Sequence, residues 1–292
     1  MTRNNLYALL ILTLIISCGS KNNERKTGAG TIAETVLNEP EPQTDIILDT
    51  IVLPYVYNNE GVEIFLPGLY RNDEPSDFAH MLREEWYELY QDSVSKNYYF
   101  VEADLDINKY DDDCMGLGYQ STYVSSKRDR DDSKLFGQAI LFIKGINAGD
   151  SLVNSVHLKQ RMVWVGNRMP FGLSGKQYAL EATGHVTEDS SIHRNEEGLL
   201  VKWEDVLNYK LYLVSEQDGK EKRELLVAIP SFNDKNVEIL FIGDLDHDDK
   251  PDFVFSTARH YESANVVLML SSKAKDGESV RCVGESGYSF DC

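Results

Sequence analysis

Four aspartates occupy alternate positions in a short segment that lies between two apolar runs, 240–243 and 253–255. They are Asp244, Asp246, Asp248 and Asp252, and Lys250 stands between the last two. Carboxylates at loop positions 1, 3, 5 and 9, with a backbone carbonyl at position 7, direct several oxygens towards one point. Ca²⁺ takes about six to eight hard oxygen ligands. The spacing therefore predicts a calcium site in which the four carboxylates and the Lys250 carbonyl are ligands.

This segment resembles the calcium loop of FG-GAP and VCBS-type repeats, whose usual form is Asp-x-Asp-Gly-Asp-Gly-x-x-Asp between two strands. The resemblance extends over 236–275 and is specific at the four aspartates. It implies a structural Ca²⁺ held by these residues. His247 and Asp249 depart from the pattern, because they stand where the family has glycine. Aspartate tolerates a left-handed turn better than most residues do. The alternative is a solvated acidic turn without an ion.

Other metal and enzyme motifs fit the chain less well. An EF-hand would need a bidentate glutamate where Phe255 stands. An apolar run followed by Asp244 and Asp246 also looks like the opening motif of haloacid-dehalogenase-type phosphatases, but no second acidic pair follows an apolar run after Asp252. A sugar-nucleotide transferase would need alternating strands and helices upstream. The sequence contains no Gly-x-Ser-x-Gly, no phosphate-binding glycine-rich loop and no His-Glu-x-x-His. No catalytic residues are therefore predicted.

A second segment repeats the same acidic spacing more weakly, at Asp104, Asp106, Asn108 and Asp112. It is either a sister ion loop or an acidic strand end. The apolar side chains of Ile107 and Tyr110 favour a strand that continues through it.

The N-terminal residues are typical of an export signal. Arg3 precedes an apolar run, 6–16, and Ser17-Cys18-Gly19 follows directly. The ending at Cys18 resembles the lipobox of bacterial lipoproteins, which implies that residues 1–17 are a signal peptide, that Cys18 is lipid-modified, and that the protein is anchored at the outer membrane or cell surface. An ordinary cleaved signal is the alternative. Residues 18–45 have few apolar side chains and are expected to form a flexible tether with a span of about 30 Å.

From residue 46 onward, short apolar or alternating runs predict strands. The runs are 46–53, 62–66, 98–105, 139–146, 162–165, 209–214, 225–229, 237–242 and 266–270. Asp218-Gly219 predicts a hairpin, and 172–175 and 284–287 are interpreted as turns. Apolar residues at helical spacing predict one amphipathic helix near 75–92. The expected fold is mainly β, with antiparallel sandwich or propeller-blade-like sheets. A boundary at 187–198 would separate β-rich domains at 46–186 and 199–292.

The charge of the chain excludes one class of partner. Its 29 Lys and Arg against 48 Asp and Glu give a formal net charge of −19. Nucleic-acid binding depends on basic side chains that displace counterions from phosphates, so no nucleic-acid partner is expected. Hydrophobic residues make up 42% of the chain, which is sufficient for a folded core.

The cysteines other than Cys18 would share an oxidising compartment. In the chain-entropy model a bond from Cys114 to Cys292 stabilises by about 5 kcal/mol, against about 3 kcal/mol for Cys282 to Cys292. The disulfide between Cys114 and Cys292 is therefore predicted, with three free buried thiols as the alternative.

These features predict a lipid-anchored, non-enzymatic binding or structural module with a glycan or a protein as its ligand. The alternative is an exported polymer-degrading hydrolase in which calcium is structural. Two facing carboxylates in a cleft would favour the hydrolase, and a flat aromatic face would favour binding. Candidates for such a face are Tyr55, Tyr57, Tyr98, Tyr99 and Trp164.

Overall fold

The computed structural model describes nine stretches of the chain, all within the compact unit Asp45–Cys292. The stretches are 61–71, 78–112, 119–130, 139–146, 152–187, 193–195, 198–200, 203–217 and 219–289. Cys18, Cys114, Cys292, the predicted signal and tether, and the predicted strand at 46–53 lie outside them. Within these stretches, no helix is long and apolar enough to span a bilayer.

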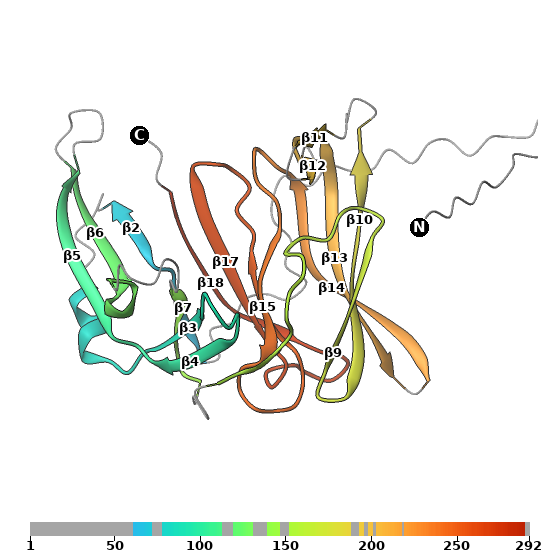
Figure 1. Ribbon diagram of the computed structural model, residues 1–292, viewed down its shortest axis with the longest axis horizontal. Coiled ribbons are helices and arrows are strands. Elements are labelled where there is room, and N and C mark those ends of the chain that lie inside the picture. The colour runs from blue at the N-terminus through green and yellow to red at the C-terminus, as the bar shows by residue number, and fades with distance from the viewer. Residues whose placement is uncertain are drawn as a thin grey trace, which may run out of the picture. The chain divides into compact units, whose positions relative to one another are not determined.

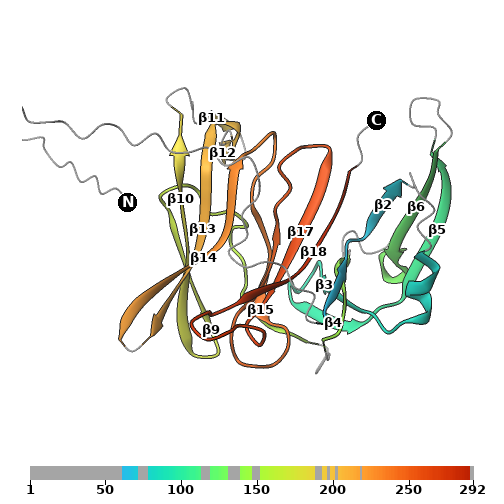
Figure 2. The same ribbon diagram turned by 180° about the vertical axis from the view of Figure 1, so that it is seen from behind.

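A five-stranded antiparallel sheet forms the central layer of this unit, in the order β18-β17-β16-β15-β8. Its strands are β8 (Asn154–Ser155), β15 (Glu238–Asp244), β16 (Asp252–Ser256), β17 (Ser263–Leu270) and β18 (Arg281–Ser289). In Figure 1 the labelled strands β15, β17 and β18 lie between β10, β13 and β14 on one side and β2 to β7 on the other. The same order is visible from behind in Figure 2.

Both faces of the central sheet are buried, and alternate residues of its strands belong to two different cores. Phe253 and Phe255 of β16 face one core, whereas Val254 between them faces the other. Val267 and Leu268 of β17 divide in the same way. Side chains of a strand alternate between its faces, so a strand buried on both faces has a continuous apolar sequence. This explains the unbroken apolar runs at 253–255 and 266–270.

The first core lies between the central sheet and a four-stranded antiparallel sheet, ordered β14-β13-β10-β9. Its strands are β9 (Arg168–Leu173), β10 (Lys176–Val186), β13 (Val206–Gln217) and β14 (Lys220–Ser231). Ser174 and Gly175, both at positive φ, connect β9 to β10, as the turn interpretation of 172–175 expected. Gln217 pairs with Lys220, which confirms the predicted hairpin, and Gly219 has φ 70°.

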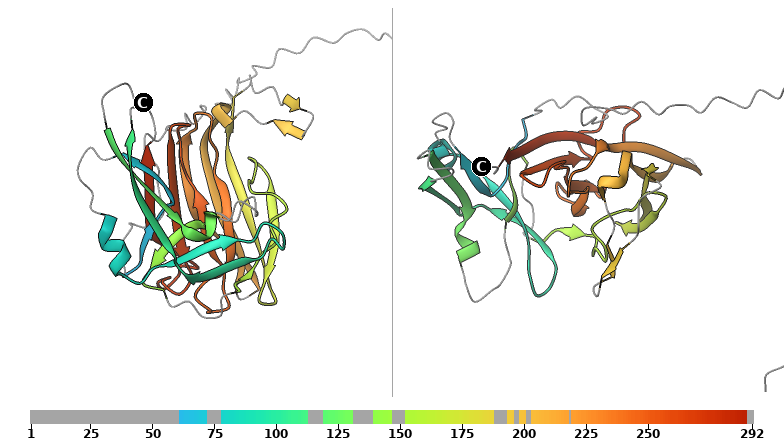
Figure 3. Two further views of the ribbon diagram at one scale, coloured as in Figure 1. Left: turned by 60° about the vertical axis from the view of Figure 1, so that its left-hand side comes forward. Right: turned by 90° about the horizontal axis from the view of Figure 1, so that it is seen from above.

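The second core lies between the central sheet and a sheet ordered β1-β7-β3-β4. Its strands are β1 (Glu63–Phe65), β3 (Tyr87–Gln91), β4 (Tyr98–Glu102) and β7 (Ala139–Lys144). A third core connects this sheet to β2 (Gly68–Arg71), β6 (Tyr119–Ser126) and β5 (Leu105–Asp112). Figure 3 shows these layers from two further directions. The fold is mainly β, and the predicted antiparallel sandwich is confirmed as a series of packed sheets.

The helical segment is much shorter than the amphipathic helix predicted near 75–92. Helix η1 (Phe78–Arg83) is a 3₁₀ helix, and Tyr87–Gln91 is strand β3 instead. β3 pairs with both β4 and β7, so it lies in the middle of a sheet, and these long-range pairings override the local helical spacing. Leu82, which the helical pattern placed on the buried face, is 57% exposed.

Two shorter predictions are wrong in the described part of the chain. Residues 162–165 form no strand, although Val163 is buried against the first core. The segment 284–287, interpreted as a turn because of its glycines, lies inside β18. Gly284 pairs with Leu268 there, and a Cβ at this position would come within 2.8 Å of Ile64. This glycine therefore permits close packing between sheets.

Strand pairing crosses the domain boundary expected at 187–198. β10, which ends at Val186, pairs with β13, and β8 pairs with β15. The segments 46–186 and 199–292 therefore share two sheets and two cores.

Candidate metal centre

The acidic loop connects two neighbouring strands of the central sheet. β15 ends at Asp244 and β16 begins at Asp252, with residues 245–251 between them. Because the two strands are antiparallel, with Gly243 opposite Asp252, the hairpin brings its first and last aspartates together. Both are buried, with exposed fractions of 4% for Asp244 and 0% for Asp252.

The loop turns sharply at the two positions where the resembling repeats have glycine. His247 has φ 63° and Asp249 has φ 62°, which places both in the left-handed region. Histidine and aspartate are enriched among the non-glycine residues that adopt this conformation. The departures noted in the sequence therefore keep the backbone turns that glycine usually provides.

Backbone hydrogen bonds fix the carboxylates of the hairpin ends. Asp244 accepts one from the N–H of Asp248 at 2.9 Å and one from that of Asp249 at 3.0 Å. Asp252 accepts hydrogen bonds from the N–H groups of Leu245 and Ser271, both at 2.7 Å. The two side chains therefore have a defined orientation within the loop.

Three of the four predicted carboxylates gather at one point. Oxygens of Asp244, Asp246 and Asp252 lie within 4.8 Å of one another. Asp248 is not part of this group. Its Oδ1 accepts hydrogen bonds from Ser271 Oγ at 2.8 Å and Lys250 N at 3.0 Å, and its Oδ2 lies 3.2 Å from Lys250 Nζ. Lys250, predicted as a carbonyl ligand, thus pairs with Asp248 through its ammonium group.

Two serines that the sequence analysis did not single out complete this environment. Ser271 and Ser272 directly follow β17, and their hydroxyl groups hydrogen-bond to Asp252 and Asp246, respectively. β17 is antiparallel to β16, so the residue after its end lies beside the start of β16. The sequence shows two serines after an apolar run, but it does not show that this run pairs with β16. Their place beside the acidic loop could therefore not be predicted without the strand order.

Burial and mutual repulsion disfavour charge on this cluster. Desolvation, followed by the charges of Asp248 and Asp244, raises the pKa of Asp246. Desolvation, followed by the charge of Asp246, raises the pKa of Asp252 well above its ordinary value. Buried carboxylates of like charge compete for protons unless a cation neutralises them.

The residues present fit a hard divalent cation such as Ca²⁺ by two criteria. The three carboxylates supply hard oxygen ligands, which suit Ca²⁺ and Mg²⁺ better than softer metals. In addition, Asp246 Oδ1 is buried and has no hydrogen-bond partner within the described residues. A buried acceptor without a partner is energetically costly, and a bound cation would satisfy it.

No protein-family model, curated protein or solved structure matches the chain.

The weaker acidic segment at 104–112 does not form a loop. Leu105–Asp112 is strand β5, which confirms the strand interpretation. Asp104 pairs with Lys127 at 2.6 Å, and Asp106 accepts a hydrogen bond from Asn108 at 2.8 Å.

Most of the aromatic residues considered for a binding face have other roles. Tyr98 is fully buried, and its hydroxyl donates to the carbonyl of Leu240 at 3.0 Å. Trp164 packs on Trp203 with ring centroids 5.0 Å apart. Tyr99 is half-buried. The candidates at positions 55 and 57 lie outside the described residues.

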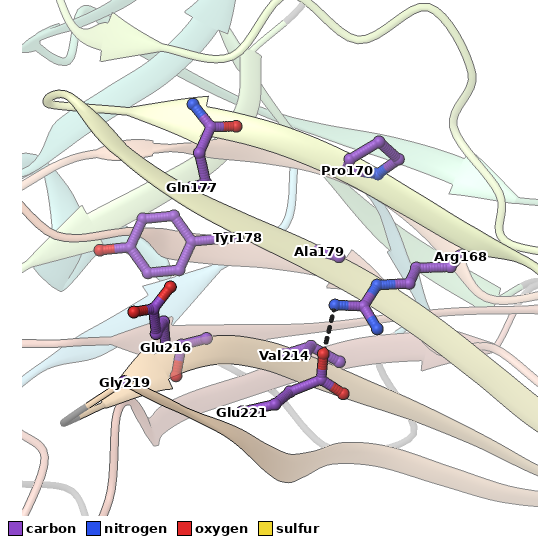
Figure 4. A pocket seen from close by; sticks show the side chains of 10 residues that line it. Arg168, Pro170, Gln177, Tyr178, Ala179, Val214, Glu216, Gly219 and Glu221 are labelled. Carbon is purple, nitrogen blue, oxygen red and sulfur yellow. Dashed lines mark hydrogen bonds and ion pairs between the residues drawn. The ribbon is translucent and has the colours of Figure 1, made fainter.

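A pocket of about 320 Å³ lies over the four-stranded sheet and is shown in Figure 4. Glu216 lies beside the Tyr178 ring, and Arg168 reaches Glu221 at 2.8 Å. The hydrogen bond from Arg168 lowers the pKa of Glu221. The remaining lining residues are Pro170, Gln177, Ala179, Val214, Ser215 and Gly219.

Of the four cysteines, Cys282 is the one within the described residues. It is buried and unpaired, and burial raises its pKa to about 12. The predicted disulfide between Cys114 and Cys292 and the predicted lipid site at Cys18 lie outside the described residues.

Proposed function

We propose that this chain is an exported, lipid-anchored binding or structural module whose acidic loop is stabilised by Ca²⁺. Two observations carry the calcium assignment: oxygens of three aspartates lie within 4.8 Å of one another, and Asp246, one of the three, has a buried Oδ1 without a hydrogen-bond partner in the described residues. Asp244 and Asp252 are held by backbone donors, so two ligands are preorganised for the ion. When bound, the ion would neutralise charge that otherwise opposes folding of the hairpin.

Calcium fits this loop better than magnesium. Mg²⁺ requires a nearly ideal octahedral shell and releases its water slowly, whereas Ca²⁺ accepts irregular geometry and more ligands. The Asp248 carboxylate lies outside the group of three and is held by Lys250 and Ser271. A ligand set with three close carboxylates and a loop of irregular shape therefore favours Ca²⁺.

The proposed location depends on the sequence around Cys18. The apolar run 6–16 and the cysteine that follows resemble a lipoprotein signal, so we place the protein at the bacterial outer membrane or cell surface. Its contact with the membrane would be the acyl chains, and its ligand a glycan or a protein. The net charge of −19 supports the absence of a nucleic-acid partner.

Two carboxylates that line pockets, Glu221 and Glu278, do not have the raised pKa of a hydrolytic acid. A glycosidase acid needs a raised pKa so that it carries a proton at neutral pH. Glu221 has a lowered pKa because Arg168 donates to it. Burial opposes ionisation of Glu278, but hydrogen bonds from Arg281 and the Lys275 backbone outweigh it, so its pKa is also lowered. Both side chains are therefore suited to fixed ion pairs.

Calcium binding is tested by isothermal titration of the purified full chain after treatment with chelator. We expect one Ca²⁺ per chain, with a dissociation constant of about 10⁻⁴–10⁻³ M, as in other extracellular modules. Asp252→Asn should abolish the binding heat. Asp276→Asn, an exposed aspartate outside the three-carboxylate group, is the matched control and should bind like the wild type. A wild type without saturable calcium binding would reject the proposal.

A further inference from the structure

A second pocket, of about 590 Å³, lies directly beside the acidic loop. One wall is formed by Tyr178 and Ser215, which are cross-strand partners two positions beyond the buried pair Leu180 and Leu213. The four-stranded sheet thus extends past the first core and exposes the end of its inner face. The other wall consists of loop and post-strand residues, namely Lys250, Pro251, Ser271, Ser272, Ala274, Lys275, Asp276, Glu278 and Ser279.

The lining of this pocket contains more lysines than acidic residues, unlike the chain as a whole. Four lysines line it, against three acidic residues, in a protein with a net charge of −19. One of the three acids, Glu278, is bound by Arg281 at 2.5 Å and 2.9 Å. The lysines are Lys176, Lys222, Lys250 and Lys275. These lysines give an anionic group local hydrogen-bond donors in a protein that as a whole is acidic.

Three of the lysines have N–H donors that are not used by hydrogen bonds within the described residues. An ammonium group has three N–H donors. The Nζ of Lys222 has two acceptors among the described residues, Glu224 and Ser279, both at 2.9 Å. The Nζ of Lys250 has one, Asp248. Lys176 is exposed and pairs with no carboxylate within the described part of the chain. Each of these three ammonium groups can donate to a further acceptor.

The remaining lining suits a hydroxylated ring. Phe171 stacks on Tyr178 with centroids 5.4 Å apart and an interplanar angle of 18°, which fixes the orientation of the half-buried Tyr178 ring. The hydroxyl group of the exposed Ser272 already donates to a carboxylate of the acidic loop, so its lone pairs remain to accept hydrogen bonds from a ligand.

We propose that this pocket binds an acidic saccharide, in which a carboxylate or sulfate lies against the lysines and a sugar ring packs against Tyr178. A sugar acid combines the acceptors, the hydroxyl donors and the apolar ring face that these residues match. The volume is within the usual range of small-molecule sites, about 300–1,000 Å³. This inference rests on the proposed binding function and names its ligand class.

The test is isothermal titration of the purified full chain, in calcium, with three acidic probes and one neutral probe. The acidic probes are tetragalacturonate, a hyaluronan tetrasaccharide and a chondroitin 4-sulfate tetrasaccharide, and the neutral probe is cellotetraose. At least one acidic probe should bind about tenfold more tightly than cellotetraose, because charge-assisted hydrogen bonds are the stronger class. Raised salt should weaken that binding. Equal or absent binding of all four probes would overturn the proposal.

Substitutions in the pocket test whether the saccharide binds there. Lys176→Ala and Tyr178→Ala should each weaken the acidic probe about tenfold, since each removes a contact of the order of a charge-assisted hydrogen bond or an aromatic anchor. Lys220→Ala and Tyr110→Ala are controls at exposed positions outside the pocket and should bind like the wild type. Unchanged binding in Lys176→Ala, whose side chain is exposed and dispensable for folding, would reject this site. Calcium titration of the same samples separates failure of the ligand class from failure of the proposed calcium site.

Discussion

Replacing Asp246 by asparagine should stabilise the protein in chelator and remove most of its stabilisation by calcium. In chelator, the substitution removes one of three carboxylates whose oxygens lie within 4.8 Å of one another. The neutral amide retains the shape of the side chain and can still accept a hydrogen bond from Ser272. The melting temperature of Asp246→Asn in chelator should therefore exceed that of the wild type.

Coulomb's law gives the order of magnitude of this effect. Two unit charges 4.8 Å apart interact by about 3.5 kcal/mol at an effective dielectric constant of about 20. Partial exposure of Asp246 and the raised pKa of Asp252, which disfavours the charged form, both reduce the repulsion. High salt should reduce the difference between the two proteins, because the exposed part of the interaction is screened.

Calcium should stabilise the wild type more than it stabilises Asp246→Asn. At a free concentration of ten times the dissociation constant, linkage stabilises the wild type by about 1.4 kcal/mol. For a unit of this size, that free energy corresponds to a rise in melting temperature of about 3–6 °C. Asp246→Asn loses a charged ligand and should show little of this rise. Magnesium should stabilise the wild type less than calcium does.

The assay is thermal unfolding followed by circular dichroism in EGTA, in about 10 mM CaCl₂ and in the same concentration of MgCl₂, which is about tenfold above the weaker expected dissociation constant. Asp276→Asn is the control for removal of an acidic charge outside the cluster. The reasoning is refuted if the wild type melts at one temperature in EGTA and in calcium. It is also refuted if Asp246→Asn is destabilised in EGTA, since the close carboxylates would then not repel each other.

Three further predictions concern other parts of the chain. Cys18→Ser should abolish fatty-acid labelling and release the protein from membranes, and an unlabelled wild type would contradict the lipoprotein interpretation. Non-reducing peptide mapping should link Cys114 to Cys292; recovery of the peptide containing Cys114 without a partner would reject this pairing. Burial raises the pKa of Glu88 above 4.5, so its contribution to stability is present below that pH and is lost as the pH rises through the folded-state pKa. Glu88→Gln should therefore gain stability relative to the wild type as the pH rises above about 4.5 in thermal unfolding, and a constant difference would contradict this.

The sequence predicted the acidic hairpin well because its determinants are local. Apolar runs on both sides predict the two strands, and Asp244 and Asp252 adopt their positions as soon as β15 pairs with β16. His247 and Asp249 have the left-handed conformation expected at the glycine positions of the resembling loop. Asp248 differs because its position depends on a distant residue, Ser271, which comes from the end of β17. The spacing of the aspartates within the loop does not predict the contact between Asp248 and Ser271.

The predicted helix failed for the same physical reason. The spacing of Phe78, Met81, Trp86 and Leu89 fits a helical stripe, yet Phe78, Met81 and Trp86 belong to the third core and Leu89 to the second. Two separate cores require this segment to change face, which one continuous helix cannot do. β3 also pairs with β7, about fifty residues further along the chain. The spacing of apolar residues within 75–92 does not predict these long-range strand pairings.

The position of the acidic loop at the end of the central sheet explains how three carboxylates remain together. β15 and β16 are buried on both faces, and residues from each contribute to the first core and to the second. The strands therefore have a fixed register before the loop is considered, because a shift by one residue would exchange their side chains between the two cores. Asp244 and Asp252 are brought together by this register, and repulsion between them can change the loop but not the pairing of the strands. A cation at this place would act on a hairpin that the two cores have already positioned.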